Sequence, residues 1–428
     1  MIIRLPFGQG AIPVDLRGFR IRPLQPEGPR AGTDTAQLVM DAVAKPLSGP
    51  SLEARARAAG DAVIIVPDGT RSARISTILP VLTQALTRWG LAPERQTVVV
   101  ACGTHPHATP AVLESILGQL EPGITSIQHD SRETSGLVVA GRVAGGREIR
   151  LCRQVVEADL LITIGAVRHH YFAGFGGGPK MVFPGVAGYE EIQANHAQVF
   201  DLSGERPIRR PECEPGRLEG NPVAFEIGEA ADLRPPDIAI CLVPGINGGV
   251  AEAVVGPWRE AFDGAVARTR EIFEVAGDQF DLVVASGGGA PSDETLIQAH
   301  KGLDAACRFA RPGAEILFLA SMAGGAGSDA IRPFLEDPQP ESILRRLAGG
   351  WVQYGHTTFR LVEKTERYRV SLVTEGNWPG LQGLGFERAA TADEVVDRWR
   401  EEFPGATVGV MTGPAVYPES QEAGTQGR

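Results

Sequence analysis

Long hydrophobic runs are absent from this sequence of 428 residues. No stretch of about 18 apolar residues occurs, so no segment is expected to span a membrane. Pro6 and Gly8 interrupt the first ten residues before an apolar core of useful length can form, and no secretory signal is expected. These absences favour a cytoplasmic protein.

Cysteine is scarce, and basic residues are outnumbered. The five cysteines are scattered, and none forms a C-x-x-C pair, so neither a disulfide framework nor a zinc knuckle is expected. Lysine and arginine number 41 against 52 aspartate and glutamate, which gives a net charge of −11. This balance disfavours nucleic-acid binding, although a single cleft could still be basic enough to hold an acidic ligand.

Short apolar runs rich in β-branched residues recur along the chain, as is typical of strands buried in a parallel sheet. The predicted strands are residues 62–66, 97–101, 160–164, 238–243, 282–285, 315–320 and 407–411. Helix-like segments alternate with them at residues 72–89, 258–275, 293–309 and 392–403. The alternation predicts an α/β fold with mainly parallel, doubly wound sheets. Residues 4–20 and 136–150 are predicted to form β-hairpins.

The length of the chain exceeds that of one ordinary hydrophobic core, so two α/β domains are predicted. We place them at residues 1–270 and 271–428, because a new strand pattern begins after Gly277 and Asp278. Helical segments near residues 258–276 and 391–403 are predicted to bridge the two domains.

The first predicted strand of the alternating pattern ends in a polar turn, Asp68-Gly69-Thr70-Arg71. Ligands of open α/β sheets bind beyond the carboxyl ends of the strands, at helix N-termini. Backbone amides there, with Thr70 and Arg71, could hold a phosphate or a carboxylate. An ordinary helix cap at Asp68 or Thr70 would also explain the turn.

Histidines follow the next two predicted strands. His105 and His107 follow residues 97–101, and His169 and His170 follow residues 160–164. Imidazoles at equivalent strand ends could converge on one cleft, where two of them would form an acid/base pair for a change of stereochemistry. A zinc site of a hydrolase is an alternative. His105 and His107 would form a ligand pair, and the further ligands could come from His169, His170 and His196.

A glycine-rich loop, residues 173–180, ends in Lys180. It is not a P-loop, because Pro179 precedes the lysine and no serine or threonine follows it. Its glycines indicate close approach of backbone amides, and Lys180 could be an electrostatic partner or a covalent tether. A short helix over residues 189–199 carries His196.

Together these segments resemble the nickel-pincer lactate racemases. The matches, which keep their order over about residues 60–305, are D-G-T-R at 68–71, G-T-H at 103–105, H-Y-F-A-G-F-G-G-G-P-K at 170–180, His196, and S-G-G-G-A-P-S-D at 286–293 with Gln298 and Lys301 beyond. The resemblance implies a racemase or epimerase of a 2-hydroxy acid. It implies reversible hydride transfer through a 2-keto acid, with the active site in the cleft between the domains.

The resemblance also implies a cofactor, the nickel pincer nucleotide (Ni(II)-pyridinium-3,5-bisthiocarboxylate mononucleotide), and cofactor-synthesis enzymes as maturation partners. Lys180 would be the covalent tether and His196 the protein ligand of nickel. The other implied roles are acid/base catalysis by His105 and His170, cofactor binding by Asp68, Gly69, Thr70 and Arg71, and substrate binding by Arg71, Gln298, Lys301 and Trp351.

Two positions depart from the family pattern. Ile297 stands where the family has a tyrosine, which predicts a more apolar wall and bears on which 2-hydroxy acid is the substrate. Histidine is doubled at His169 and His170, and His170 is the one that lies ten residues before Lys180, as in the family. A noncatalytic ligand-binding homologue with the same fold is a further alternative.

Overall fold

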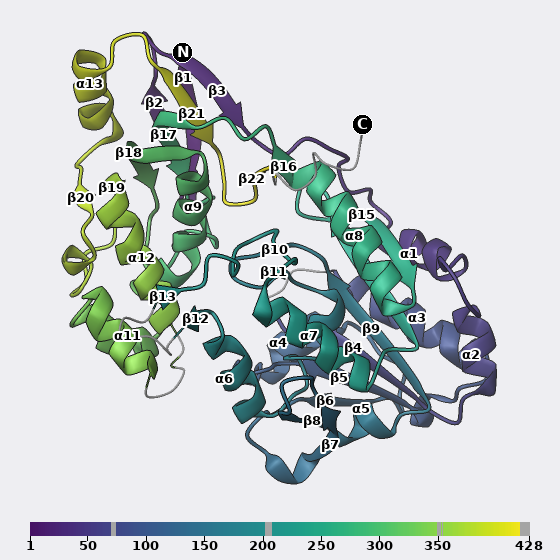
Figure 1. The fold of residues 1–428 in the computed structure, drawn as a ribbon. Helices are drawn as coiled ribbons and strands as arrows, with labels where there is room; N and C mark the ends of the chain where they lie inside the picture. Colours follow the sequence, from purple (N-terminus) through teal and green to yellow (C-terminus); the bar gives the residue numbers. More distant parts are fainter. Residues whose placement is uncertain (70–73, 202–207, 349–351, 353, 420–428) are drawn as a thin grey trace, which may run out of the picture. The chain divides into compact units, whose positions relative to one another are not determined.

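The computed structural model describes residues 1–69, 74–201, 208–348, 352 and 354–419. The chain divides into two compact units, shown as a ribbon in Figure 1. The larger unit is Gly28–Ile272, and the smaller unit combines Met1–Glu27 with Phe273–Arg428. The division after Ile272 lies near the predicted boundary at residue 270, but residues 1–27 belong to the smaller unit instead of the first domain.

The larger unit is built on a six-stranded sheet. In spatial order the strands are β15 (Val250–Gly256), β14 (Ile238–Pro244), β9 (Leu160–Ala166), β4 (Ala62–Pro67), β5 (Gln96–Ala101) and β6 (Thr125–Gln128). All neighbours are parallel except β14 and β15. Every residue of β4 is buried, because the strand lies in the middle of the sheet and its apolar run can be covered on both faces.

Helices and short strands complete this unit. They are α1 (Thr35–Val43), α2 (Leu52–Ala58), α3 (Ile75–Arg88), α4 (Pro110–Leu117), α5 (Arg153–Glu157), α6 (Tyr189–Ala197), α7 (Pro222–Leu233), α8 (Trp258–Phe273), β7 (Leu137–Arg142), β8 (Glu148–Cys152), β10 (His169–His170), β11 (Gly174–Phe175), β12 (Phe200–Asp201), β13 (Ile208–Arg209) and the 3-10 turn η3 (Gly178–Met181). Helix α3 presents Ile75, Ile78, Leu82 and Leu86 to the same core as strands β4 and β5, as its apolar spacing predicts.

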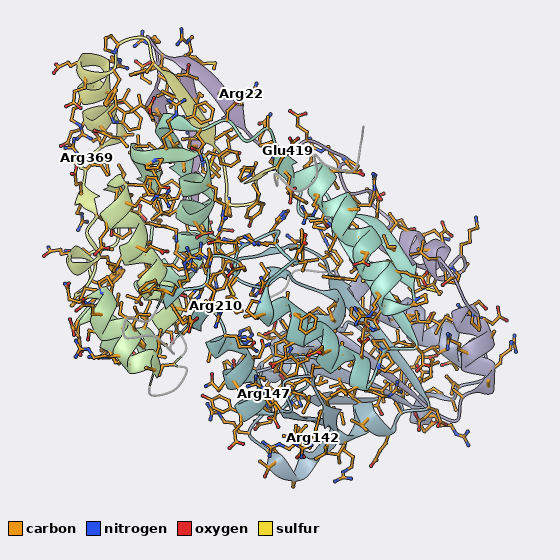
Figure 2. The ribbon with its side chains drawn as sticks, viewed as in Figure 1. Arg22, Arg142, Arg147, Arg210, Arg369 and Glu419 are labelled. Atoms are coloured by element: carbon orange, nitrogen blue, oxygen red, sulfur yellow. The ribbon has the colours of Figure 1, made fainter. Side chains whose placement is uncertain are left out.

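The smaller unit has a second six-stranded sheet, and all its neighbours are parallel. In spatial order the strands are β20 (Glu387–Arg388), β19 (Arg369–Val373), β18 (Ala310–Leu319), β17 (Phe280–Ser286), β21 (Thr407–Met411) and β3 (Arg20–Leu24). The other elements include β1 (Ile2–Phe7), β2 (Gly10–Asp15), α9 (Leu296–Arg308), α10 (Arg332–Leu335), α11 (Pro340–Ala348), α12 (Gly355–Arg367), α13 (Ala392–Glu402), β16 (Glu274–Val275) and β22 (Tyr417–Pro418). Arg369 of β19, which is labelled in Figure 2, forms ion pairs with Glu387 and Glu315.

Residues 1–27 pair and pack with residues from the C-terminal part of the chain. Strand β3 adds to β21 at the edge of the smaller sheet, and β1 and β2 form the predicted hairpin. Leu5, Val14 and Leu16 are fully buried in one core with strand residues of β17. These alternating apolar side chains are therefore buried in the core of the smaller unit. Local sequence patterns do not indicate this placement.

The predicted α/β class with mainly parallel sheets is confirmed, and the hairpin predicted over residues 136–150 forms as β7 and β8. The segment 391–403, predicted as a bridge, is a core helix instead: α13 buries Val395, Val396 and Trp399 in the smaller unit. Among the described residues, no helix is long and apolar enough to cross a membrane.

Candidate active site

Three neighbouring strands of the larger sheet lead into the segments that carry the candidate residues. Strands β9, β4 and β5 are adjacent and parallel, so their carboxyl ends lie at one edge. Asp68 follows β4, His105 follows β5, and His170 follows β9. The topology therefore brings together side chains that lie up to about a hundred residues apart in the chain.

His105 is paired with a carboxylate. Its Nδ1 lies 2.6 Å from Oδ2 of Asp68, whose side chain is 10% exposed, while that of His105 is 34% exposed. A carboxylate ion only accepts hydrogen bonds, so Nδ1 carries the hydrogen and the neutral ring keeps its lone pair on Nε2. Asp68, predicted as a cofactor-binding residue, thus orients the imidazole of His105.

The glycine loop lies against the end of β9. Gly177 has φ 71°, and a Cβ atom there would lie 2.5 Å from the carbonyl oxygen of Ala166, the last residue of β9. Only glycine fits such a conformation and approach. The loop leads directly into η3, which contains Lys180 and contacts strands β4, β9 and β14.

Phe172 forms the centre of the candidate site. Its ring centroid lies 4.6 Å from that of His170 and 5.1 Å from that of His196, and Nζ of Lys180 lies 5.5 Å from it. The side chain is buried, at 3% exposure. Sequence reasoning missed this residue, although it stands within the aromatic run between His170 and the glycine loop.

His196, on α6, is held as a neutral imidazole. Burial lowers its pKa to about 3, and the positive charge of Lys180 and that of His105, when protonated, act in the same direction. Both side chains therefore lie within electrostatic reach of His196. Its Nδ1 is 3.2 Å from Oδ1 of Asn195, an acceptor, which leaves the lone pair of the neutral ring on Nε2.

His170 is buried at 8% exposure among aromatic rings. It meets Phe172 edge to face, and it stacks on Tyr171 with centroids 5.3 Å apart. The backbone N–H of Ala173 donates a hydrogen bond of 3.3 Å to its Nδ1. The ring is thereby fixed by its own hairpin.

The remaining histidines of these turns have other contacts. His107 donates from Nε2 to the carbonyl oxygen of His129 at 3.2 Å, and buried His129 bonds the carbonyl oxygen of Ala187 at 2.8 Å. The ring of His169 lies 4.7 Å from that of Phe175 on the paired strand β11. In the part of the chain that the structure describes, no group of three or more His, Cys, Asp or Glu side chains is arranged to hold a metal ion.

Two of the predicted substrate-binding residues, Gln298 and Lys301, are exposed on α9. Nζ of Lys301 donates to Oε1 of Gln298 at 2.7 Å, and neighbouring Ile297 packs against the core of that unit. Gly69 is exposed in the larger unit. Thr70, Arg71 and Trp351 lie outside the described residues.

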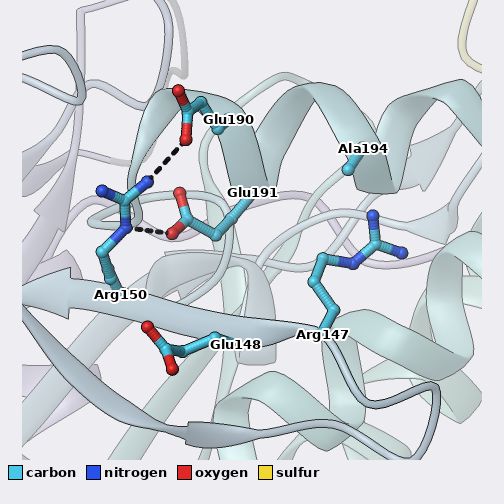
Figure 3. Close-up of a pocket in the computed structure, with 6 residues that line it drawn as sticks. All are labelled: Arg147, Glu148, Arg150, Glu190, Glu191 and Ala194. Atoms are coloured by element: carbon cyan, nitrogen blue, oxygen red, sulfur yellow. Dashed lines mark hydrogen bonds and ion pairs between the residues drawn. The ribbon is translucent and has the colours of Figure 1, made fainter.

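A shallow surface cavity of about 520 Å³ lies between β8 and α6 (Figure 3). Its arginines are paired: Arg150 with Glu190 and Glu191 of the lining, and Arg147 with Glu226, which lies outside the lining. The cavity is lined by Arg147, Glu148, Arg150, Glu190, Glu191 and Ala194. None of the predicted site residues lines it.

Comparison with known proteins shows a similarity to lactate racemases. The model of the lactate racemase N-terminal domain matches residues 7–206. Lactate racemase of Thermoanaerobacterium thermosaccharolyticum is 27% identical over 81% of this chain and 80% of its own length. Lactate racemase of Lactiplantibacillus plantarum is 29% identical over 70% of this chain and 69% of its own.

Solved structures show the same fold. The lactate racemase apoprotein of T. thermosaccharolyticum superposes with a TM-score of 0.86 at 24% identity, over 97% of this chain and 99% of that one. A protein from Thermotoga maritima gives a TM-score of 0.62 at 15% identity, over 87% and 99% of the two chains. The family model over residues 7–206 and the two sequence relatives show that the chain is similar to lactate racemases, which are isomerases.

Proposed function

We propose that the protein racemises or epimerises a 2-hydroxy acid, with lactate as the first candidate because two sequence relatives are named for it. The observation that carries the proposal is the gathering of His170, His196 and Lys180 around Phe172, with His105 within electrostatic reach of His196. Two acid/base groups, an amine and a neutral imidazole thus occur together.

The chemistry of the substrate explains why such a set is needed. The hydrogen on the carbinol carbon is not acidic, because the adjacent carboxylate is already negative and removal of a proton would add a second charge. Removal as hydride is easier when the hydroxyl proton leaves at the same time, since a planar 2-keto acid results. Return of hydride to the opposite face gives the other enantiomer.

The residues fit a nickel pincer nucleotide. This cofactor brings most of its own nickel donors, so one neutral imidazole from the protein suffices, and His196 has that state with its Nε2 lone pair directed away from Asn195. Lys180 supplies an amine close to the same aromatic ring. When bound, the cofactor supplies the acceptor and donor of hydride.

The side chains of this chain handle protons and orientation. His105 takes the hydroxyl proton at Nε2, and Asp68 stabilises the imidazolium that forms. His170 has the same acid/base role for the opposite enantiomer of the substrate. Buried Phe172 excludes water from the space between the polar groups.

The remaining proposed roles come from the family resemblance. Arg71, Gln298, Lys301 and Trp351 would bind the substrate, with the cation of Arg71 or Lys301 on its carboxylate. Gly69, Thr70 and Arg71 would contact the cofactor. Maturation would depend on cofactor-synthesis enzymes, and the compartment would be the cytoplasm.

The cofactor assignment is tested by producing the protein together with cofactor-synthesis enzymes and measuring nickel content, visible absorption and intact mass. Wild-type protein is expected to carry nickel, a chromophore and a covalent mass increment. Lys180→Ala should lose the increment, whereas Lys45→Ala, at an exposed lysine, should keep it.

The same measurements separate the competing functions. Zinc without a chromophore would support the hydrolase. Protein that carries neither a metal nor a chromophore would support a noncatalytic binder. An increment that persists in Lys180→Ala would refute the tether at this lysine.

A further inference from the structure

The two proposed acid/base histidines have opposite hydrogen bonds at Nδ1. His105 faces Oδ2 of Asp68 at 2.6 Å, and a carboxylate accepts, so Nδ1 of His105 carries hydrogen. His170 faces the backbone nitrogen of Ala173 at 3.3 Å, and an amide N–H donates, so Nδ1 of His170 carries a lone pair. In both rings Nδ1 is engaged by a neighbouring group, and we take Nε2 as the atom that exchanges a proton with the substrate.

A neutral imidazole carries one hydrogen, so the two rings rest in different tautomers. Neutral His105 has its lone pair on Nε2 and is ready to accept a proton. Neutral His170 already has a hydrogen on Nε2.

Proton balance shows which of these states suits catalysis. In a two-histidine exchange, one ring accepts the hydroxyl proton at Nε2 and becomes an imidazolium with hydrogen on both nitrogens. The other begins as an imidazolium, gives its Nε2 proton to the substrate oxygen, and ends neutral with hydrogen on Nδ1. Every acting state of either ring therefore has hydrogen on Nδ1.

Asp68 accepts a hydrogen bond from His105 in all of these states, but the amide of Ala173 points its own hydrogen at Nδ1 of His170. We propose, building on the racemase function above, that the Ala173 amide holds His170 in a resting Nε2–H tautomer and must release Nδ1 before His170 exchanges a proton. His105 can therefore accept a proton in its resting tautomer, whereas His170 can do so only after the Ala173 amide has released Nδ1.

The packing around His170 keeps the hydrogen bond from the Ala173 amide in place. The ring is 8% exposed and lies edge to face with Phe172, with centroids 4.6 Å apart, so a flip that exchanges its two nitrogens is hindered. Ala173 is 1% exposed, and the next residue, Gly174, pairs with His170 across the β10–β11 hairpin. Release of Nδ1 thus requires a movement of this hairpin turn.

The size of the effect follows from the strength of one hydrogen bond. A neutral hydrogen bond of this kind shifts an equilibrium by roughly 2- to 10-fold. We expect the resting tautomer of His170 to be favoured by a factor in that range, and the same factor to be recovered in turnover when the amide hydrogen is removed.

Nitrogen NMR of histidine-labelled protein tests the tautomers directly, without cofactor, at alkaline pH where imidazoles are neutral. His105→Gln and His170→Gln spectra assign the two rings. The expected result is hydrogen on Nδ1 of His105 and on Nε2 of His170. Hydrogen on Nδ1 of His170 would overturn the proposal, even if no variant at residue 173 folded.

A pair of variants then tests the gate in the mature enzyme. Ala173→Pro removes the amide hydrogen and is expected to shift His170 toward Nδ1–H and to raise kcat roughly 2- to 10-fold. Ala173→Gly keeps the hydrogen and should keep the wild-type tautomer. A shifted tautomer with unchanged kcat in Ala173→Pro would contradict the gating of His170. Wild-type holoprotein that fails to invert any 2-hydroxy acid would instead refute the racemase function, and the tautomer result would still stand.

Discussion

At the scale of single residues, the site depends on a few hydrogen bonds that set the state of each imidazole. Asp68 fixes His105 with hydrogen on Nδ1, Asn195 fixes His196 likewise, and the Ala173 amide fixes His170 the other way. Residue types and spacing were sufficient to nominate the histidines and Lys180. Their partners were not predictable, because each pairing depends on how separate turns meet in space.

The acid/base pair gives the first prediction. His105→Ala and His170→Ala proteins are each expected to lose at least about 100-fold in kcat, since a positioned general acid or base contributes typically 10²–10⁴-fold. Nickel content should stay at the wild-type level, because neither residue is the proposed ligand. The measurement is turnover of a 2-hydroxy acid with metal analysis of the same samples.

A matched control is His107→Ala, which alters a histidine bonded to a backbone carbonyl. It should retain most activity. Full activity in His105→Ala or in His170→Ala would remove that residue from the mechanism.

At the scale of elements, helices α9 and α12 of the smaller unit share a buried ionic cluster. Asp304, at 4% exposure, lies 2.6 Å from Nη2 of Arg360 and 2.8 Å from Nζ of Lys364. Arg308, on the same helix as Asp304, also pairs with it at 3.1 Å. These cations hold the pKa of Asp304 well below its usual range despite burial. The carboxylate therefore joins two helices through their charged side chains.

Removal of this carboxylate leaves buried cations without their counter-charge. Asp304→Ala is expected to destabilise the protein by about 3–5 kcal/mol. The exposed pair Asp281 and Arg311 provides the control, and Asp281→Ala should change stability by roughly 0–1 kcal/mol. Urea unfolding measures both variants, and equal losses would contradict the account of the buried cluster.

His300, on α9 beside this cluster, makes stability depend on pH. Burial, with the charges of Lys301 and Lys364, lowers its pKa from 6.5 to about 3. Between these values the unfolded chain binds a proton that the folded protein does not, so stability falls as pH decreases from about 6.5. The expected slope for one such group is about 1.4 kcal/mol per pH unit.

His300→Gln should unfold with a shallower dependence on pH than the wild type. Urea unfolding at several values between pH 7 and pH 5 provides the comparison. Parallel curves for the two proteins would show that His300 is not the group that titrates.

Element boundaries were harder to predict than element types. Helix α9 begins at Leu296 rather than at residue 293, and buried Asp293 instead accepts hydrogen bonds from the backbone of Gly8 and Ser321. These partners lie in other parts of the chain. Local periodicity therefore identified the helix but not its first residue, because the residues before it are held by tertiary contacts.

At the scale of the whole molecule, the apolar strand runs and their alternation with helices were enough to predict an α/β fold with mainly parallel sheets. The assignment of residues 1–27 failed, because the strand order of the smaller sheet places β3 beside β21 from the opposite end of the chain. Short-range patterns contain no information on such a pairing.

The central claim is that the chain inverts the carbinol carbon of a 2-hydroxy acid. The most direct measurement incubates cofactor-loaded protein with one pure enantiomer of lactate, and of other 2-hydroxy acids, and follows the enantiomer ratio by chiral chromatography. For a racemised acid the account predicts that the opposite enantiomer accumulates until the two are equal. Protein that carries nickel and the covalent adduct but leaves every acid enantiomerically pure would contradict it.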